Sequence, residues 1–423
     1  MSRIRVSTLA NGMRVASDPM DSVETASVGV WVEAGSRFER APINGISHFL
    51  EHMVFKGTRN RDARAIAEEI EAVGGHLNAH TSREYTAFYA KVLKENQGLA
   101  IDIIADLLQN ATLDDEELSR ERTVVIQEIM QANDTPDDII FDRFQETAFP
   151  AQALGRSVLG TPEHIGALTR DVVMGYMREH YGAPRMILAA SGRVEHEALV
   201  AMAEEAFASL PAAVSSEREP AEYRGGEWRE ERDLEQVHLV MGFRGLGFRD
   251  PDFHALSVLS TILGGGMSSR LFQEAREKRG LVYSIYTFPA AYTDIGLFGV
   301  YAGTGEREAG ELVPLVCDEI ASMIESVSAE ELARARAQMK AGLLMSLEST
   351  SSRCEQLARQ LMVFERPIPV AESVAKIEAV DATAVRRAAQ RLFTSAPTMA
   401  SIGPIGQVPA LGDVTSHLLL PVA

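Results

Sequence analysis

The chain has 423 residues, of which 46% are hydrophobic and 24% are charged, as is ordinary for a globular protein. This length is too great for one compact core, so we expect two or more domains. The formal net charge of −19 argues against a nucleic-acid partner, because a phosphate backbone needs a basic surface. The sequence contains no run of about 18 apolar residues that could span a membrane.

Cysteine usage and the first residues indicate the compartment. Cys317 and Cys354 are the only cysteines, too few for a disulfide framework. The opening segment, MSRIRVSTLANGMRV, alternates like a strand and lacks the apolar stretch of a secretory signal. We therefore expect a soluble protein in a reducing, cytoplasmic compartment.

Strands and helices are predicted along the whole chain. The first residues predict a hairpin that turns at Asn11-Gly12, and TASVGVWVEAG predicts a half-buried strand. A polar stretch that begins at Ala212 predicts a linker over 212–231, between an N-terminal domain (1–211) and a C-terminal domain (232–423). Helical periodicity follows the first strands and predicts helices around 44–56, 62–73, 93–109, 114–131, 162–179 and 195–209.

The second half of the sequence resembles the first. Both halves run from a strand through a Gly-rich turn to an apolar helix, and Phe248 aligns with Phe38. A repeat this long indicates two similar domains, so we predict an α+β fold of two homologous domains, each a mainly antiparallel sheet packed with helices. Polar groups of the first copy face apolar or small residues of the second: His48, Glu51, His52, Glu121 and Glu128 align with Val258, Thr261, Ile262, Ala335 and Gly342.

The run HFLEHMVF (48–55) places three titratable groups among large apolar residues. His48, Glu51 and His52 share one face of a helix, because positions i, i+3 and i+4 do so. Two neutral imidazoles at this spacing are good zinc ligands, and the glutamate is placed to take a proton from the attacking water. This is the inverted zincin order, HxxEH. The alternative is a pair of core histidines bonded to a buried carboxylate.

A catalytic zinc site usually needs a third protein ligand. The segment RERTVVIQEIM offers Glu121 and Glu128, which lie seven residues apart on one helical face. We favour Glu128 as the ligand, with Glu121 nearby to support a histidine. Spacing alone leaves the choice open between Glu128 and some other carboxylate.

The segment HFLEHMVFKGT resembles the pitrilysin family of zinc metallopeptidases (peptidase family M16), in particular its processing-peptidase branch, and the likeness extends over essentially the whole chain. The family places its third zinc ligand about as far beyond the second histidine as Glu128 lies from His52, and its essential acidic residue corresponds to Glu121. The resemblance thus implies a processing-peptidase/LuxS-like metallohydrolase fold with one Zn²⁺ per chain, held by His48, His52 and Glu128.

A third motif, GGHLNAHTSREYTAFYAKV (74–92), resembles the edge strand on which the family pairs an extended substrate. Free strand edges capture peptides through unpaired N–H and C=O groups. Asn78 and Ala79 are the substrate-binding positions carried over. His80 stands where the family usually has Phe or Tyr, and we place it in the substrate pocket, the alternative being a surface histidine.

A fourth motif, REKRGLVYSIYTF, carries Arg276 and Tyr283, which match an Arg and a Tyr that the family brings from its second domain to the active site. A guanidinium and a phenol can bond the scissile carbonyl as it becomes an oxyanion, or hold the substrate backbone. Without the resemblance, both residues would be read as structural.

Together these motifs predict a zinc metalloendopeptidase that hydrolyses short or unfolded peptides, preferably basic and presequence-like ones. Glu51 would act as base and then as acid. The resemblance also implies an enclosed chamber and a homodimer. One alternative is a non-catalytic, core-protein-like subunit of a larger complex. A second is a metallohydrolase that acts on a small thioether or amide.

Overall fold

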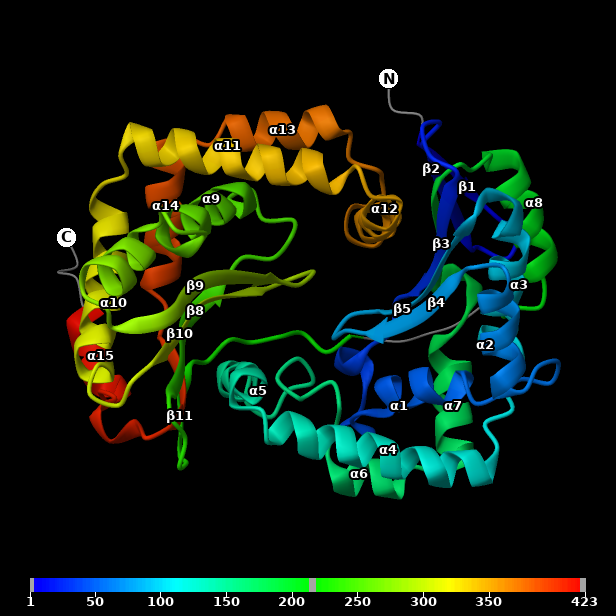
Figure 1. The fold of residues 1–423 in the computed structure, drawn as a ribbon, viewed down its shortest axis with the longest axis horizontal. Helices are drawn as coiled ribbons and strands as arrows, with labels where there is room; N and C mark the ends of the chain where they lie inside the picture. The colour runs from blue at the N-terminus through cyan, green and yellow to red at the C-terminus, as the bar shows by residue number, and fades with distance from the viewer. Residues whose placement is uncertain (1–3, 213–217, 419–423) are drawn as a thin grey trace. The chain divides into compact units, whose positions relative to one another are not determined.

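The computed structural model describes residues 4–212 and 218–418, and the chain forms two compact units (Figure 1). Each unit is built from segments that lie far apart in the sequence. Unit 1 comprises Met1–Met130, Arg156–Glu219 and Leu344–Ile368, and unit 2 comprises Gln131–Gly155, Pro220–Leu343 and Pro369–Ala423.

Unit 1 contains a six-stranded sheet in the order β1-β2-β6-β3-β5-β4. Only β2 and β6 pair in parallel, and the other neighbours are antiparallel. The predicted hairpin joins β1 to β2, with Gly12 at a φ of +93° that favours glycine. The strands are β1 (Arg5–Thr8), β2 (Arg14–Pro19), β3 (Thr25–Val32), β4 (His76–Thr81), β5 (Thr86–Leu93) and β6 (Met186–Gly192).

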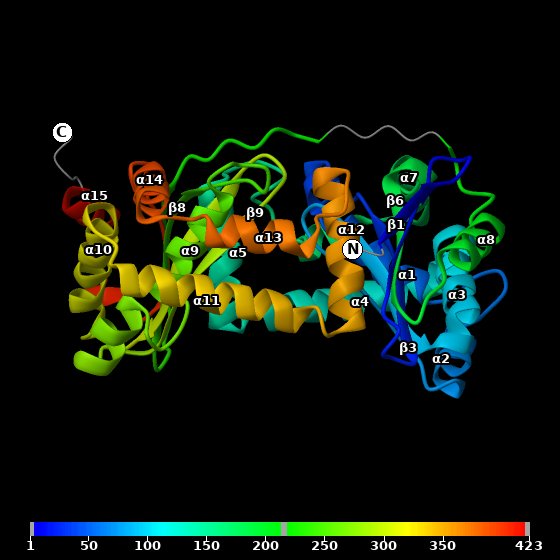
Figure 2. The same ribbon diagram turned by 90° about the horizontal axis from the view of Figure 1, so that it is seen from above.

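Helices cover both faces of the unit 1 sheet, as the two views in Figures 1 and 2 show. One face packs mainly against α1 (Ile46–Val54), α3 (Gln97–Asn110), α7 (Arg170–His180) and α8 (His196–Ala206). The opposite face packs against α12 (Thr350–Phe364). The remaining helices of this unit are α2 (Ala63–Ala72), α4 (Asp115–Asn133) and α6 (Pro162–Ala167).

All six predicted helical regions of the first half contain helices. The region predicted around 162–179 is interrupted, because Leu168 leaves the helical conformation after α6. Thr169 then caps α7 by accepting a hydrogen bond from the backbone N–H of Val172, which is a strong helix-start signal.

Unit 2 repeats the topology of unit 1. Its five strands lie in the order β7-β11-β8-β10-β9, and only β7 and β11 pair in parallel, at the place that corresponds to β2 and β6. This confirms the two-domain α+β fold with mainly antiparallel sheets. The strands are β7 (Gly226–Glu231), β8 (Val237–Gly245), β9 (Val282–Ala291), β10 (Gly296–Thr304) and β11 (Thr398–Gly403).

The core of unit 2 also has two layers of helices around its sheet. Val258 and Ile262, the counterparts of the two motif histidines, are buried on α9, so this helix packs through apolar groups at those positions. The layer that includes α9 consists of α9 (Phe253–Gly264), α10 (Ala309–Glu325), α14 (Ala382–Phe393) and α15 (Leu411–Leu418), while α5 (Pro136–Ala148) covers the other face, and α11 (Ala329–Ser346) and α13 (Val370–Glu378) complete the unit.

Two corresponding helices are exchanged between the halves of the sequence. Helix α5, from the first half, packs against the sheet of unit 2, and α12, from the second half, packs against the sheet of unit 1. The domain bounds predicted from the sequence, 1–211 and 232–423, stay a prediction, and the two compact units are assembled from other residue ranges.

The predicted linker at 212–231 is too long. Residues 226–231 form strand β7, which pairs with β11, because the parallel pair of this sheet requires a strand here. Residues 213–217 of that linker lie outside the described residues.

Both cysteines are buried and free. In the two ranges that the structure describes, every helix is too short or too polar to cross a lipid bilayer.

Candidate metal centre and active site

Helix α1, which carries the HxxEH run, begins at a tightly built N-terminus. Gly45 precedes it with a φ of +94°, and a Cβ there would lie 2.7 Å from the carbonyl oxygen of Leu159. The buried carboxylate of Glu39 accepts hydrogen bonds from the backbone N–H groups of Gly45 and Ser47 and from Asn44 Nδ2, each at 2.8 Å. A carboxylate at the N-terminus of a helix also complements the helix dipole. Glu39 therefore fixes where α1 starts.

Glu39→Gln should lower the free energy of unfolding by about 2 kcal/mol, because glutamine replaces a charged acceptor of three hydrogen bonds with a neutral amide. Denaturant unfolding followed by circular dichroism would measure the change. Glu24→Gln is the control, since it removes an exposed carboxylate of the same unit that pairs with Lys94 and should change stability little. A loss no greater than that of the control would contradict the capping role.

Three predicted ligands converge at one point. The ligand atoms of His48, His52 and Glu128 all lie within 4.8 Å of one another. The two Nε2 atoms are 3.2 Å apart, and Glu128 Oε2 lies 3.8 Å from Nε2 of His48 and 3.6 Å from Nε2 of His52. Helix α4 supplies Glu128, whose side chain is 44% exposed, so the group is open on one side.

This donor set fits a zinc ion. Zinc bonds of 2.0–2.1 Å in a tetrahedral site place neighbouring donors about 3.3 Å apart, close to the separations found here. The Nδ1 of His52 lies 2.8 Å from Glu121 Oε1, and a carboxylate only accepts, so Nδ1 carries a proton and Nε2 of the neutral ring presents a lone pair. The two Nε2 atoms and the Glu128 carboxylate oxygen converge at a range that suits a cation between them.

The protonation states of the two histidines follow from their surroundings. Burial, together with the neighbouring His52, lowers the pKa of His48 to about 4, so this imidazole is neutral at pH 7. Burial is the largest single effect on His52 and opposes its charged form, but the hydrogen bond to Glu121 and the charges of Glu121, Glu128 and Glu51 together outweigh it and raise the pKa of His52. Glu121 is itself buried, and it occupies the supporting place that the sequence predicted.

Glu51 lies on the same helix and is tied to the edge strand. Its Oε2 accepts a hydrogen bond from Thr81 Oγ1 at 2.5 Å, and Thr81 is the last residue of β4. Burial raises the pKa of Glu51 above the usual range for a glutamate, although the Thr81 hydrogen bond opposes this. A raised pKa suits a carboxylate that must both accept and return a proton near neutral pH.

Strand β4 is the edge of the unit 1 sheet, where the sequence predicted it. Ala79 packs towards the core that contains α1, and its N–H donates to Asn78 Oδ1 at 2.9 Å. The ring of His80 lies beside those of Tyr85 and Tyr89, with centroids 5.6 and 5.7 Å away. Roles of Asn78, Ala79 and His80 in substrate binding stay predictions.

Unit 2 brings Arg276 and Tyr283 together. The guanidinium carbon of Arg276 lies 5.6 Å from the centroid of the Tyr283 ring and 4.9 Å from that of Phe272, so cation–π contacts hold it. Arg276 and Phe272 belong to a π-helix, η5 (Phe272–Lys278), a rare form often found at functional sites. The Tyr283 side chain is largely exposed. Participation of this pair in catalysis stays a prediction.

Three supporting residues were missed in the sequence. Thr81 donates a hydrogen bond to Glu51. Glu39 binds the start of α1, and Phe272 packs against the guanidinium of Arg276. Strand alternation could have placed Thr81 on the same face as Ala79. Spacing i, i+4 could have paired Phe272 with Arg276. Nothing local distinguishes Glu39 from other glutamates.

Comparison with known proteins agrees with this geometry. Residues 14–162 match the family described as "Insulinase (Peptidase family M16)", and residues 167–339 match "Peptidase M16 inactive domain". The chain is 41% identical over 421 residues to the probable mitochondrial-processing peptidase subunit beta of Arabidopsis thaliana, with 96% of this chain and 79% of that protein covered. The chain belongs to peptidase family M16.

Bacterial proteins are also similar to this M16 chain. An uncharacterized zinc protease of Rickettsia felis is 38% identical over 400 residues, covering 94% of this chain and 97% of that one. Among solved structures, a protease from Helicobacter pylori matches with a TM-score of 0.88 at 23% identity, covering 96% of this chain and all of that one. A chain of complex III2 from Candida albicans also matches with a TM-score of 0.88, at 22% identity and 98% and 99% coverage. At these low identities, the two structures show that the M16 chain shares their fold.

Proposed function

We propose that this M16 chain is a zinc-dependent endopeptidase that hydrolyses short or unfolded peptides. The convergence of His48, His52 and Glu128 within zinc-binding distance of one another carries the proposal. The proton-transfer group, Glu51, lies on the same helix as the histidines and accepts a hydrogen bond from the last residue of β4, the edge strand of the sheet that the described residues form. A metal site, a base and a peptide-binding edge are the parts that peptide hydrolysis requires.

The residues divide the reaction among them. An extended substrate pairs with β4. A carbonyl oxygen of the substrate replaces Asn78 Oδ1 as the acceptor for the Ala79 N–H. Glu51 takes a proton from the attacking water and gives it to the leaving amine, while Thr81 keeps the carboxylate aimed. When bound, zinc supplies a Lewis acid that polarises the scissile carbonyl. Arg276 and Tyr283 would bond the oxyanion or the substrate backbone.

Metal removal tests the proposal directly. Dialysis against a chelator should abolish cleavage of a peptide library, and one equivalent of Zn²⁺ per chain should restore it, because the three ligands form a single site. Mass spectrometry of the digests would give the cleavage positions, and elemental analysis the zinc content. Cleavage that survives complete removal of the metal would rule out the metallopeptidase.

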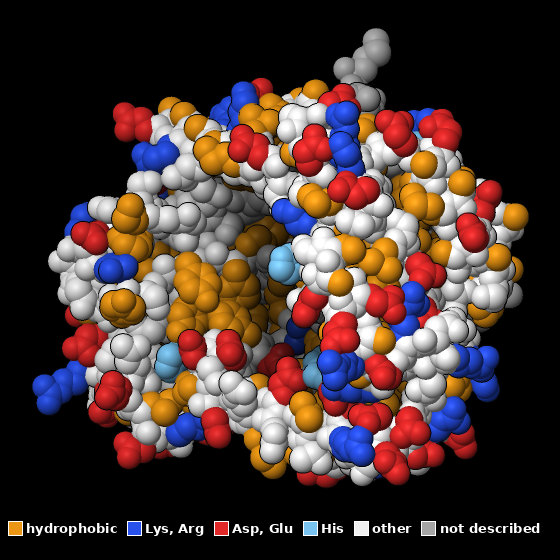
Figure 3. Space-filling model, turned by 45° about the vertical axis from the view of Figure 1, so that its right-hand side comes forward, with side chains coloured by type: hydrophobic (Ala, Val, Ile, Leu, Met, Phe, Trp, Pro, Cys, Tyr) orange, Lys and Arg blue, Asp and Glu red, His pale blue; other side chains and the backbone are white. Residues whose placement is uncertain are grey.

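We further propose a preference for basic, presequence-like peptides. Acidic residues outnumber Lys and Arg by 60 to 41, although the two signs are interspersed on the face in Figure 3. Raising salt from 0.01 to 0.1 M shortens the screening length from about 30 to about 10 Å, so KM should rise more for a Lys/Arg-rich peptide than for its neutral analogue. Equal salt dependence for both peptides would remove the electrostatic preference.

The alternative of a non-catalytic, core-protein-like subunit takes support from the similarity of fold to a chain of complex III2. The complete ligand set disfavours it, since a structural subunit needs neither the ligands nor Glu51. A thioether or amide hydrolase would not need the free β4 edge. An enclosed chamber, a homodimer and a cytoplasmic location are further parts of our proposal, and light scattering would test the dimer.

A further inference from the structure

The supporting carboxylate Glu121 has a second partner. While its Oε1 accepts from His52 Nδ1, its Oε2 lies 2.7 Å from Lys56 Nζ. The Glu121 side chain is 4% exposed and that of Lys56 is 32% exposed, so the ammonium reaches inward from the surface. A buried carboxylate with one cationic partner on one oxygen has its other oxygen fixed in direction.

Lys56 lies two residues beyond the end of α1, and backbone hydrogen bonds hold it on both sides. Its N–H donates to the carbonyl of Met53. The next residue, Gly57, has a φ of +132°, a value that favours glycine, and its carbonyl accepts from the N–H of Thr112 at 3.0 Å. The position of Lys56 is therefore set by the turn that follows it.

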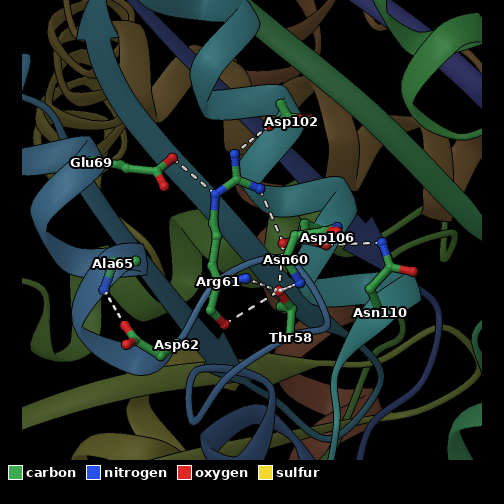
Figure 4. A network of polar contacts seen from close by, with 9 residues as sticks. All are labelled: Thr58, Asn60, Arg61, Asp62, Ala65, Glu69, Asp102, Asp106 and Asn110. Carbon is green, nitrogen blue, oxygen red and sulfur yellow. Dashed lines mark hydrogen bonds and ion pairs between the residues drawn. The ribbon is translucent and has the colours of Figure 1, made fainter.

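That turn is anchored to α3 by Asp106 (Figure 4). The Asp106 carboxylate, which is buried, accepts hydrogen bonds from Thr58 Oγ1 and Asn60 Nδ2 at 2.6 Å each, from Asn110 Nδ2 at 2.8 Å, and from the Arg61 guanidinium at 3.0 Å. Three of these four donors belong to the turn, so their bonds to one buried carboxylate leave the turn little freedom. The metal chemistry uses none of these groups directly.

We propose that Lys56 is a positioning residue for the metal site: it clamps Glu121, so that Glu121 orients the imidazole of His52, and the Asp106-anchored turn holds Lys56 in place. Partners of a metal-binding histidine commonly set ligand orientation and metal affinity. Lys56 extends this chain of contacts by one step, from His52 through Glu121 to the turn after the metal helix.

The test is zinc affinity, measured on the metal-free chain by competition with a chromophoric chelator. Lys56→Met should weaken zinc binding about tenfold, the lower end of the range for groups that support a ligand. Lys56→Arg keeps the charge and the N–H donors and should recover most of the affinity. Lys94→Met is the matched control, because Lys94 forms an ion pair with Glu24 in the same unit, and its affinity should equal that of the parent.

Two further variants separate positioning from general stability. Lys56→Met should have almost no effect in a Glu121→Gln background, since coupled residues are non-additive. Asp106→Asn should weaken binding in the same direction as Lys56→Met and gives an independent measurement should Lys56→Met fail to fold. Unchanged affinity in folded Lys56→Met, or an equal loss with and without Glu121, would overturn the proposal.

The inference rests on the proposed function only in placing the metal at His48, His52 and Glu128. Should the parent chain bind zinc but cleave no peptide, the proposed function would fail while the affinity comparison would still decide the role of Lys56.

Discussion

Glu51→Gln should reduce kcat for peptide cleavage about 10³-fold while the protein keeps its zinc. General acid–base catalysis by a positioned side chain contributes about 10²- to 10⁴-fold, and glutamine has the shape of glutamate but cannot take up the proton. Thr81 can still donate to the glutamine carbonyl oxygen, so the edge strand and α1 should stay joined. Burial disfavours the charged form of Glu51, so a neutral amide at this position should not lower stability.

Initial rates with a cleavable peptide, alongside zinc analysis of the same samples, would measure this effect. Glu71→Gln is the matched control, because Glu71 is exposed on α2 in the same unit and its loss should leave kcat unchanged. Parent-like cleavage by Glu51→Gln would assign the proton transfer to another group. Loss of zinc from this variant would instead mean that Glu51 helps to hold the metal.

Glu128→Gln should weaken zinc binding more than about 100-fold, which is the upper end of the loss seen when only a supporting group is removed. A neutral amide replaces the one anionic donor among the three ligand atoms, and the imidazoles of His48 and His52 alone make a poor site for a divalent cation. Cleavage should disappear with the metal, and excess Zn²⁺ should restore part of it.

Chelator competition would give the dissociation constants. Glu116→Gln is the control on the same helix: Glu116 lies in the exposed first turn of α4 and contacts Arg120, so its removal should not change the affinity. Parent-like zinc binding by Glu128→Gln would show that another carboxylate completes the site.

The metal centre was predictable because most of its information is local or repeated. The spacing of His48, Glu51 and His52 fixes a shared helical face whatever the rest of the fold does. Apolar counterparts in the second half mark these groups as dispensable for packing. Glu128 needed the family spacing, since Glu121 shares its face and is the more deeply buried of the two.

The supporting contacts were not predictable because tertiary structure creates them. Thr81 meets Glu51 only after β4 has paired at the edge of the sheet, and Glu39 meets the start of α1 only through the intervening loop. Lys56 lies one turn beyond His52, but only the folded chain shows that its ammonium reaches Glu121. Sequence patterns report which face a side chain is on, and not which distant group it meets.

The exchange of α5 and α12 was equally hidden, since an amphipathic helix can cover either of two similar sheets. Its consequence concerns how the polypeptide can be divided. A fragment that stops at residue 211 would retain every proposed zinc ligand, yet it would lack α12 and leave Trp31, Ile187 and Ala189 open to water. Separately produced halves should therefore aggregate alone and regain solubility only when mixed, because each half supplies the helix that covers the sheet of the other. The exchange of α5 and α12 therefore makes each half of the sequence depend on the other for a fully covered sheet.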